Sequence, residues 1–287
     1  MATFYNQATL IYNGNETNSN ITEGQILNGA DITKIALSSN YAKQDGVNYA
    51  ISLVNTAPTS INNLTITDNL GAFIPIGLST EVTPLTYVEN SLIYYINGVL
   101  STPLETEVTP EGLVISGINL PPNSNALILY ETRANEFAPL SAGSSITNTV
   151  TLSGVPSTEE TSASATVPVR NFTNLTISKA ICPETISDNS ELSYTFIIQN
   201  SGNTPAVATD NVVITDTFTP IINPITVTLN GEVLTEGTDY TYDSTTGEFK
   251  TLIGTVTVPA ATFTTNPTTG AVISSPGVSV LKIDGII

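Results

Sequence analysis

The chain has 287 residues and a formal net charge of -18 at pH 7, and 40% of its residues are hydrophobic. The excess of acidic groups repels phosphate backbones and anionic lipid headgroups, which argues against nucleic acid and membrane surfaces as partners. Histidine is absent, which excludes Ser-His and Cys-His catalytic pairs and imidazole metal sites, so we expect no enzyme, no cofactor and no metal.

The predicted elements are short β-strands separated by tight turns. Asn-Gly dipeptides, which are typical of hairpin turns, occur at Asn13-Gly14, Asn97-Gly98 and Asn230-Gly231. Polar and apolar residues alternate in residues 47–54 and 192–198, and no stretch keeps a helical apolar period over three turns. The sequence therefore predicts an all-β protein of two tandem antiparallel Ig-like β-sandwiches.

The first predicted strand covers residues 3–12 and belongs to an N-terminal arm at residues 1–20. Because side chains alternate along a strand, one face carries a set of four residues. This set is Phe4, Asn6, Ala8 and Leu10.

After the arm the chain repeats itself, which predicts a first domain at residues 21–171 and a second at 172–287. From Ile32 the sequence ITKIALSSNYAKQDGVNYAISLVNTAPTSINNLTITDNL matches ISKAICPETISDNSELSYTFIIQNSGNTPAVATDNVVITDTF from Ile177. Each copy contains a strand with a lysine, an alternating strand that ends in Asn, a corner with proline, and a strand that ends in Ile-Thr-Asp.

The two copies end differently. The first continues through ALILYETRA to a last strand, SITNTVTLSG from Ser145, whereas the second ends with VSVLKIDGII, the counterpart of ALILYETRA. The missing strand appears at the N-terminus, where TFYNQATLIYNG from Thr3 aligns with SITNTVTLSG. The following ETNSNITEGQILNGADITK aligns with STEETSASATVPVRNFTNLTISK. The sequence thus predicts a last strand, a complete domain, and then a domain without its last strand.

An orphan strand and an unfilled groove in one chain are complementary. An open sheet edge needs a cover, and the N-terminal strand of a second copy can provide it by β-augmentation. Since donor and groove are different surfaces, the contact is heterologous and builds a filament unless rotation closes a ring. We therefore expect a fibre subunit whose partners are copies of itself. The alternative stays open that residues 1–20 fold back onto the second domain of their own chain.

Strand parity places three polar side chains on the apolar face of the first domain: Lys34, Asn148 and Asp68. Burial lowers the pKa of a lysine, so a neutral amine can attack the asparagine carbonyl, release ammonia and leave an isopeptide bond. A buried, protonated carboxyl group would polarise that carbonyl. The alternative is a noncovalent polar cluster or a partly exposed lysine.

The second domain carries the matching Lys179 and Asp216 but no asparagine strand of its own. Its asparagine would be Asn6 of the neighbouring copy, which would make the joint between subunits covalent. Glu131 and Asp284, in equivalent late strands, are the reserve candidates for the acid.

These motifs resemble the bacterial surface repeat known as the conserved-repeat domain, or domain of unknown function eleven. The resemblance rests on the lysine strand, the corner Asn200–Ala206, the strand endings TDTF and TDNL, and the closing NTVTL. It implies β-sandwich modules of surface and fimbrial proteins in Gram-positive bacteria, some of which carry Lys-Asn isopeptides in this strand order. The family commonly has Leu-Pro after TDT, and this chain departs from that pattern. The chain is also similar to subunits of spore appendages.

We expect an extracellular protein at a cell or spore surface. No basic or apolar leader opens the sequence, no sorting signal stands at Ile286-Ile287, and no window approaches eighteen apolar residues. A leader already removed, or release by lysis of the mother cell, would account for this, and we expect no membrane insertion. Cys182 is the single cysteine, so it forms no internal disulfide, and we expect it to be a small buried or edge residue or, alternatively, to link to another chain.

Two other classes of function remain as alternatives. A monomeric surface adhesin or carbohydrate-binding module could stack Tyr240 and Tyr242 on sugars, although tyrosines at alternate strand positions usually pack. Calcium could bind the carboxylates of Asp239, Asp243 and Glu159-Glu160, but no loop has the spacing of a calcium motif.

Overall fold

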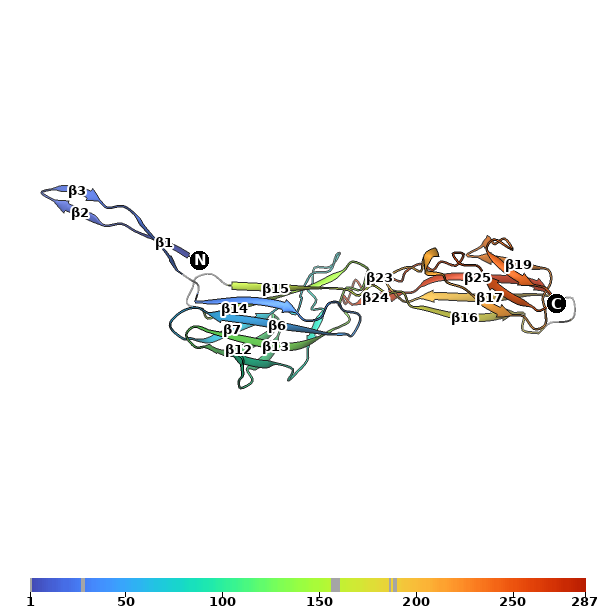
Figure 1. Ribbon diagram of the computed structural model, residues 1–287, viewed down its shortest axis with the longest axis horizontal. Helices are drawn as coiled ribbons and strands as arrows, with labels where there is room; N and C mark the ends of the chain where they lie inside the picture. Colours follow the sequence, from blue (N-terminus) through green and yellow to red (C-terminus); the bar gives the residue numbers. More distant parts are fainter. Residues whose placement is uncertain (1, 27–28, 156–160, 186, 188–189) are drawn as a thin grey trace. The chain divides into compact units, whose positions relative to one another are not determined.

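The computed structural model describes residues 2–26, 29–155, 161–185, 187 and 190–287 (Figure 1). The protein is all-β, as predicted: apart from one 3₁₀ turn, η1 (Ala208–Asp210), every regular element in these ranges is a strand in an antiparallel sheet. The chain divides into two compact units, Met1–Ala138 with Ser145–Pro168 (unit 1) and Pro139–Ser144 with Val169–Ile287 (unit 2). No helix in the described part of the chain has the length and hydropathy needed to cross a membrane.

Unit 1 is built on two sheets whose buried faces form its core. The first has the order β10-β9-β13-β6-β5, with β8 also paired to β13, and the second has the order β11-β12-β7-β14-β15. The strands of the first sheet are β5 (Ala30–Ala36), β6 (Gly46–Asn55), β8 (Leu85–Tyr87), β9 (Ile93–Ile96), β10 (Val99–Leu100) and β13 (Ser124–Ala134). Those of the second are β7 (Ile61–Asp68), β11 (Glu105–Thr109), β12 (Gly112–Leu120), β14 (Ser145–Ser153) and β15 (Thr161–Pro168).

Alternating sequence makes these strands, because every second side chain enters the core. Burial alternates along β13 and β14, and the inward residues of both sheets are apolar with few exceptions. The largest fully buried side chains of unit 1 are Tyr41, Tyr49, Ile51, Leu53, Leu64, Ile66, Leu85, Leu113, Ile115 and Ile118.

The N-terminal arm is a β-hairpin and not a single strand. β1 (Ala2–Asn6) pairs with β4 (Thr22–Ile26), and β2 (Thr9–Tyr12) pairs with β3 (Asn15–Asn18). The predicted turn at its tip is confirmed: Asn13 and Gly14 have φ of 49° and 77°, which a type I′ turn requires. The arm therefore extends beyond residue 20 and comprises two antiparallel segments.

Unit 2 has a similar first sheet, of order β16-β17-β25-β19-β20, but within the described residues its second sheet has three strands, β18-β22-β21. Its strands are β16 (Leu175–Cys182), β17 (Glu191–Asn200), β18 (Thr215–Thr217), β19 (Ile225–Leu229), β20 (Glu232–Val233), β21 (Tyr240–Asp243), β22 (Glu248–Thr251), β23 (Thr262–Thr265), β24 (Val272–Ser275) and β25 (Gly277–Ile286). β23 and β24 form a separate hairpin. The core is rich in aromatic side chains, among them Tyr194, Phe196, Phe218 and Phe249.

The two units differ where the repeats of the sequence differ. In unit 1 the edge of β7 is occupied by β14, which pairs in turn with β15. In the described part of unit 2, the counterpart of β7, β18, pairs with β22 alone. The consequence is visible at matched positions, because Ile32 on β5 is 7% exposed whereas Ile177 on β16 is 56% exposed.

Candidate functional site

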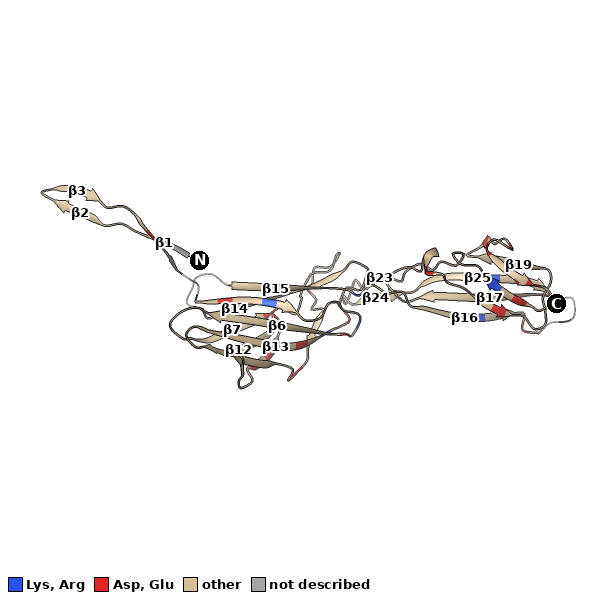
Figure 2. Cartoon of the chain, in the orientation of Figure 1, with Lys and Arg blue, Asp and Glu red and all other residues tan. Residues whose placement is uncertain are grey.

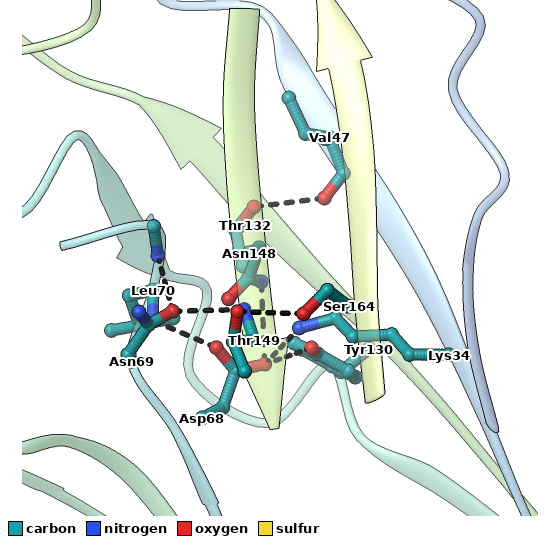
Figure 3. Close-up of polar contacts among 11 residues, drawn as sticks. Lys34, Val47, Asp68, Asn69, Leu70, Tyr130, Thr132, Asn148, Thr149 and Ser164 are labelled. Atoms are coloured by element: carbon teal, nitrogen blue, oxygen red, sulfur yellow. Dashed lines mark hydrogen bonds and ion pairs between the residues drawn. The ribbon is translucent and has the colours of Figure 1, made fainter. Parts of the chain in front are cut away.

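A cluster of polar side chains lies inside the apolar core of unit 1 (Figure 3). Lys34 comes from β5, Asp68 is the last residue of β7, and Asn148 comes from β14, so the three predicted residues are brought together from both sheets. Tyr130 of β13 also enters the cluster. The parity argument therefore located the cluster, because each of these strands turns alternate residues inward.

Asp68 is the centre of the cluster. Lys34 Nζ lies 2.8 Å from Asp68 Oδ2, Asn148 Nδ2 donates to the same oxygen at 3.3 Å, and the Tyr130 hydroxyl donates to it as well. Asp68 Oδ1 accepts the backbone N–H of Leu70 at 2.8 Å. The lysine amine and the asparagine amide thus meet at one carboxylate oxygen.

The strand that carries Asn148 is fixed on both sides. On one side, the backbone N–H of Thr149 donates to Asn69 Oδ1 at 2.9 Å, next to the end of β7. On the other, the Thr149 hydroxyl lies 2.8 Å from the Ser164 hydroxyl of β15 (Figure 3). These bonds fix the register of β14, and therefore the position of the Asn148 amide beside Asp68.

The cluster is fully enclosed. The side chains of Lys34 and Asp68 have 0% exposure, and the lysine amine stands 4.6 Å from the ring centroid of Tyr49. Burial lowers the pKa of Lys34 to about 8, against the opposing effect of Asp68. Burial also raises the pKa of Tyr130, and the Asp68 charge adds to that rise. The lysine is therefore neutral more often than an exposed one near neutral pH.

Two polar atoms of the cluster are left unsatisfied. Asn148 Oδ1 is buried without a hydrogen-bond partner, and so is the hydroxyl of Tyr49. A buried acceptor without a partner costs about 1–3 kcal/mol, and native structures contain few of them. Asn148 Oδ1 is the carbonyl oxygen that a protonated Asp68 was expected to polarise, but Asp68 contacts the amide nitrogen instead, so that part of the prediction is wrong.

Unit 2 contains a partly exposed counterpart of the lysine–aspartate pair of this cluster. Lys179 Nζ of β16 pairs with Asp216 Oδ2 of β18, and the lysine amine lies 4.4 Å from the ring centroid of Tyr194. The side chains of Lys179 and Asp216 are 39% and 19% exposed, against 0% for both residues of the unit 1 pair. Asn6, its predicted partner from another copy, lies on β1 opposite Thr22.

The two reserve acids lie outside both clusters. Glu131 is on the outer face of β13, 37% exposed and 3.8 Å from Arg133. Asp284 is on the outer face of β25, where it pairs with Lys282 at 2.7 Å. Both predictions are wrong for the same reason: each acid neighbours an inward residue, and adjacent residues of a strand face opposite ways.

Sequence reasoning missed the two tyrosines of the unit 1 cluster. Tyr130 lies directly before Glu131 and shares the parity of the buried Ile128, which was the signal available for it. Tyr49 shares its face with the buried Ile51 in the same way, as the two lie two residues apart. An alternating strand that contains tyrosine gives no sign of whether its hydroxyl meets a polar cluster or water.

The residues of the alternative functions are placed as follows. Tyr240 is buried at 5% exposure, and the Tyr242 hydroxyl donates to the Ile222 carbonyl at 2.7 Å, so both pack against the protein. Asp239 and Asp243 accept hydrogen bonds from nearby backbone N–H groups, and Glu159-Glu160 lies outside the described residues. Where the structure describes side chains, no cluster of three or more His, Cys, Asp or Glu could hold a metal ion.

The remaining surface features are the single cysteine and the distribution of charged residues. Cys182 is exposed at the end of β16, the edge strand of its sheet, so it is an edge residue and not a buried one. Charged residues are sparse along the strands of both units (Figure 2), in line with the low charged fraction of 11%.

Neither a protein-family model nor a curated protein matches the chain. Among solved structures it is similar to BcpA, the major pilin subunit of Bacillus cereus, at 12% identity and a TM-score of 0.37, over 96% of this chain and 73% of that one. RrgB, the pilus backbone of Streptococcus pneumoniae, gives 14% identity and a TM-score of 0.34 over 86% and 55% of the two chains.

The 35 kDa C-terminal fragment of the major pilin GBS80 of Streptococcus agalactiae gives 12% identity and a TM-score of 0.36 over 86% and 91%. At these identities and TM-scores the likeness supports no conclusion about this chain, and its function has to be argued from its own residues.

Proposed function

We propose that this protein is the structural subunit of an extracellular fibre, which grows head to tail when the N-terminal segment of one copy enters unit 2 of the next. The observation that supports this is the uncovered inner side of β16. Ile177 and Lys179 are exposed there, whereas Ile32 and Lys34 at the matched positions of β5 are buried. The N-terminal segment aligns in sequence with β14, the strand that occupies the edge of β7 in unit 1.

The geometry of such a contact determines the assembly. Backbone pairing along the free edge of β18 would supply affinity, and the inward side chains of the donor would supply specificity. Because donor and acceptor are different surfaces, each added copy leaves one of each free, and the chain of copies continues. Location at a cell or spore surface rests on the family resemblance alone.

We further propose that unit 1 carries an internal cross-link between Lys34 and Asn148. The neutral lysine amine attacks the side-chain carbonyl carbon of Asn148, a new C–N bond forms, and the bond to the amide nitrogen breaks. Asp68 Oδ2, which contacts both nitrogens, takes a proton from the lysine and passes it to the departing nitrogen, which leaves as ammonia. The product has no buried charge on the lysine, which removes its desolvation cost.

The same reaction between copies would join Lys179 to Asn6, with Asp216 as the proton carrier. Lys179 and Asp216 are already paired in the single copy, and the matched pair of unit 1 also contacts an asparagine amide. Insertion of the donor would supply such an amide and remove water from the pair. The fibre would then be continuous through covalent bonds.

The proposal is tested by electron microscopy and by boiling in detergent. We expect the wild-type protein to form long threads, which after boiling in detergent give a ladder of covalent oligomers on a gel. A chain without residues 2–26 should stay monomeric. Asn6→Ala should still form threads but dissociate on boiling, whereas Gln7→Ala, the neighbour that faces the other way, should keep the ladder. Threads from the chain without residues 2–26 would contradict the assembly, and full dissociation of boiled wild type would contradict the bond between copies.

A further inference from the structure

Unit 1 completes its sandwich with two strands and not one. β14 pairs with β7, with Val150 opposite Asp68, and β15 pairs with the far side of β14, with Ala165 opposite Asn148. β15 is the strand that lies along β5. Its inward residue Val167 is fully buried. The inner side of β5 is therefore covered mainly by the second strand of this hairpin.

Unit 2 lacks counterparts of both strands in its described residues. The free edge of β18 corresponds to the edge that β14 occupies, and the exposed side of β16 corresponds to the surface beside β15. Ile177 and Ile181 of β16 are 56% and 39% exposed. A single strand added to β18 would leave most of that surface in water.

The N-terminal arm is a two-stranded hairpin, like the pair β14 and β15 that has no counterpart in the described residues of unit 2. Its two halves pair antiparallel with Asn6 opposite Thr22, as Asn148 lies opposite Ala165 in unit 1. The paired segments align in sequence with β14 and β15 respectively. A hairpin of two strands is marginally stable alone in water, and this one exposes apolar side chains to 62–71% of their area. These side chains are Tyr5, Leu10, Ile11, Tyr12 and Ile21.

We infer that the donor is the whole hairpin β1–β4, which enters unit 2 of the next copy as one body. β1 and β2 pair with β18, and β3 and β4 lie along β16. The pairing of β14 with β7 transfers to a register with Ala8 opposite Asp216, Thr9 opposite Thr215 and Leu10 opposite Ile214. The inference rests on the proposed function and replaces its single donor strand by two.

A disulfide lock across the hairpin tests this directly in the full chain. Thr9 and Asn18 are paired, their side-chain oxygens are 2.7 Å apart, and Thr9 faces away from the side that carries Ala8 and Leu10. Thr9→Cys with Asn18→Cys, in a Cys182→Ser background, would hold the two halves together when oxidised. We expect the oxidised and reduced forms to assemble into threads at equal rates.

The outcomes separate the inference from the proposed function. If the oxidised form stays monomeric and assembles on reduction, a single strand is inserted and the inference is overturned, while the fibre proposal stands. If the wild type forms no threads, both fail.

A second readout applies if the locked variant assembles in neither state. Ile177→Cys in the Cys182→Ser background places a thiol on the surface that β3 and β4 would cover. We expect its alkylation to slow by an order of magnitude or more in threads relative to unassembled protein. Ile253→Cys, at a position 69% exposed, is the control and should react equally in both states. A thiol at residue 177 that stays reactive in threads would overturn the inference.

Discussion

At the scale of the residue, the same two side chains behave differently in the two units. Lys34 and Lys179 hold matched positions and both pair with an aspartate, at Asp68 and Asp216. Lys34 is enclosed, and burial lowers its pKa to about 8. Lys179 remains partly in water, which screens its charge. The environment and not the residue type therefore decides which lysine is prepared to act as a nucleophile.

The internal cross-link predicts a defined mass. We expect the intact wild-type chain to weigh one ammonia less than its sequence, because the reaction expels the amide nitrogen of Asn148. Lys34→Met should restore the full sequence mass, and Lys43→Met, which removes an exposed lysine, should keep the deficit. Mass spectrometry of the intact variants measures this, and a wild type of full mass would rule the bond out.

A pH profile distinguishes a cross-linked lysine from a free one. In Asn148→Ala the bond cannot form, so Lys34 keeps a free amine. The pKa of that amine is about 8 in the folded protein, because it is buried, and about 10.5 in the unfolded chain. Between these values the unfolded state binds more protons, so stability should rise with pH, by up to about 3 kcal/mol. Above this window stability should fall, because burial raises the pKa of Tyr130 and only the unfolded tyrosine ionises.

The cross-linked wild type has no amine at this position to titrate, so its stability should change little between pH 8 and 10. Urea denaturation of unassembled protein at a series of pH values gives the comparison. Parallel profiles for wild type and Asn148→Ala would count against the bond.

At the scale of the element, β5 and β16 show what a covering hairpin contributes. Their sequences match, yet β5 alternates between buried and exposed residues while β16 is exposed along almost its whole length. The difference lies in the presence of β14 and β15 over β5. A strand's burial is thus a property of its neighbours, although its alternation is a property of its sequence.

Matched substitutions in these two strands should affect different properties, the stability of unit 1 for β5 and assembly for β16. Ile32→Ala should destabilise unit 1 by about 2–4 kcal/mol, because it opens a cavity under the covering hairpin. Ile177→Ala should change the free energy of unfolding of the unassembled protein by no more than about 0.5 kcal/mol, since that side chain is exposed. It should instead raise the protein concentration needed for threads. Urea denaturation and sedimentation measure the two effects, and a large loss of stability in unassembled Ile177→Ala would contradict the uncovered surface.

At the scale of the whole molecule, the chain contains a closed unit, an open unit and an N-terminal hairpin. The closed unit has both sheets complete, while the open one, in the residues that the structure describes, exposes apolar side chains beside an unpaired strand edge. Loss of residues 2–26 should therefore remove assembly without unfolding unit 1, because its sheets are complete without the arm. Circular dichroism beside the microscopy would show this.

The sequence by itself determined the β-strands, the Asn-Gly turns, the out-of-phase repeat and the meeting of Lys34, Asp68 and Asn148. These features follow from local alternation and from comparison of the chain with itself, which need no coordinates. Only the tertiary structure decided that Tyr130 and not Glu131 faces the lysine, that the arm is a hairpin, and that Lys179 is partly exposed. Pairing and exposure depend on which strands lie side by side, and that is set by contacts between segments far apart in the chain.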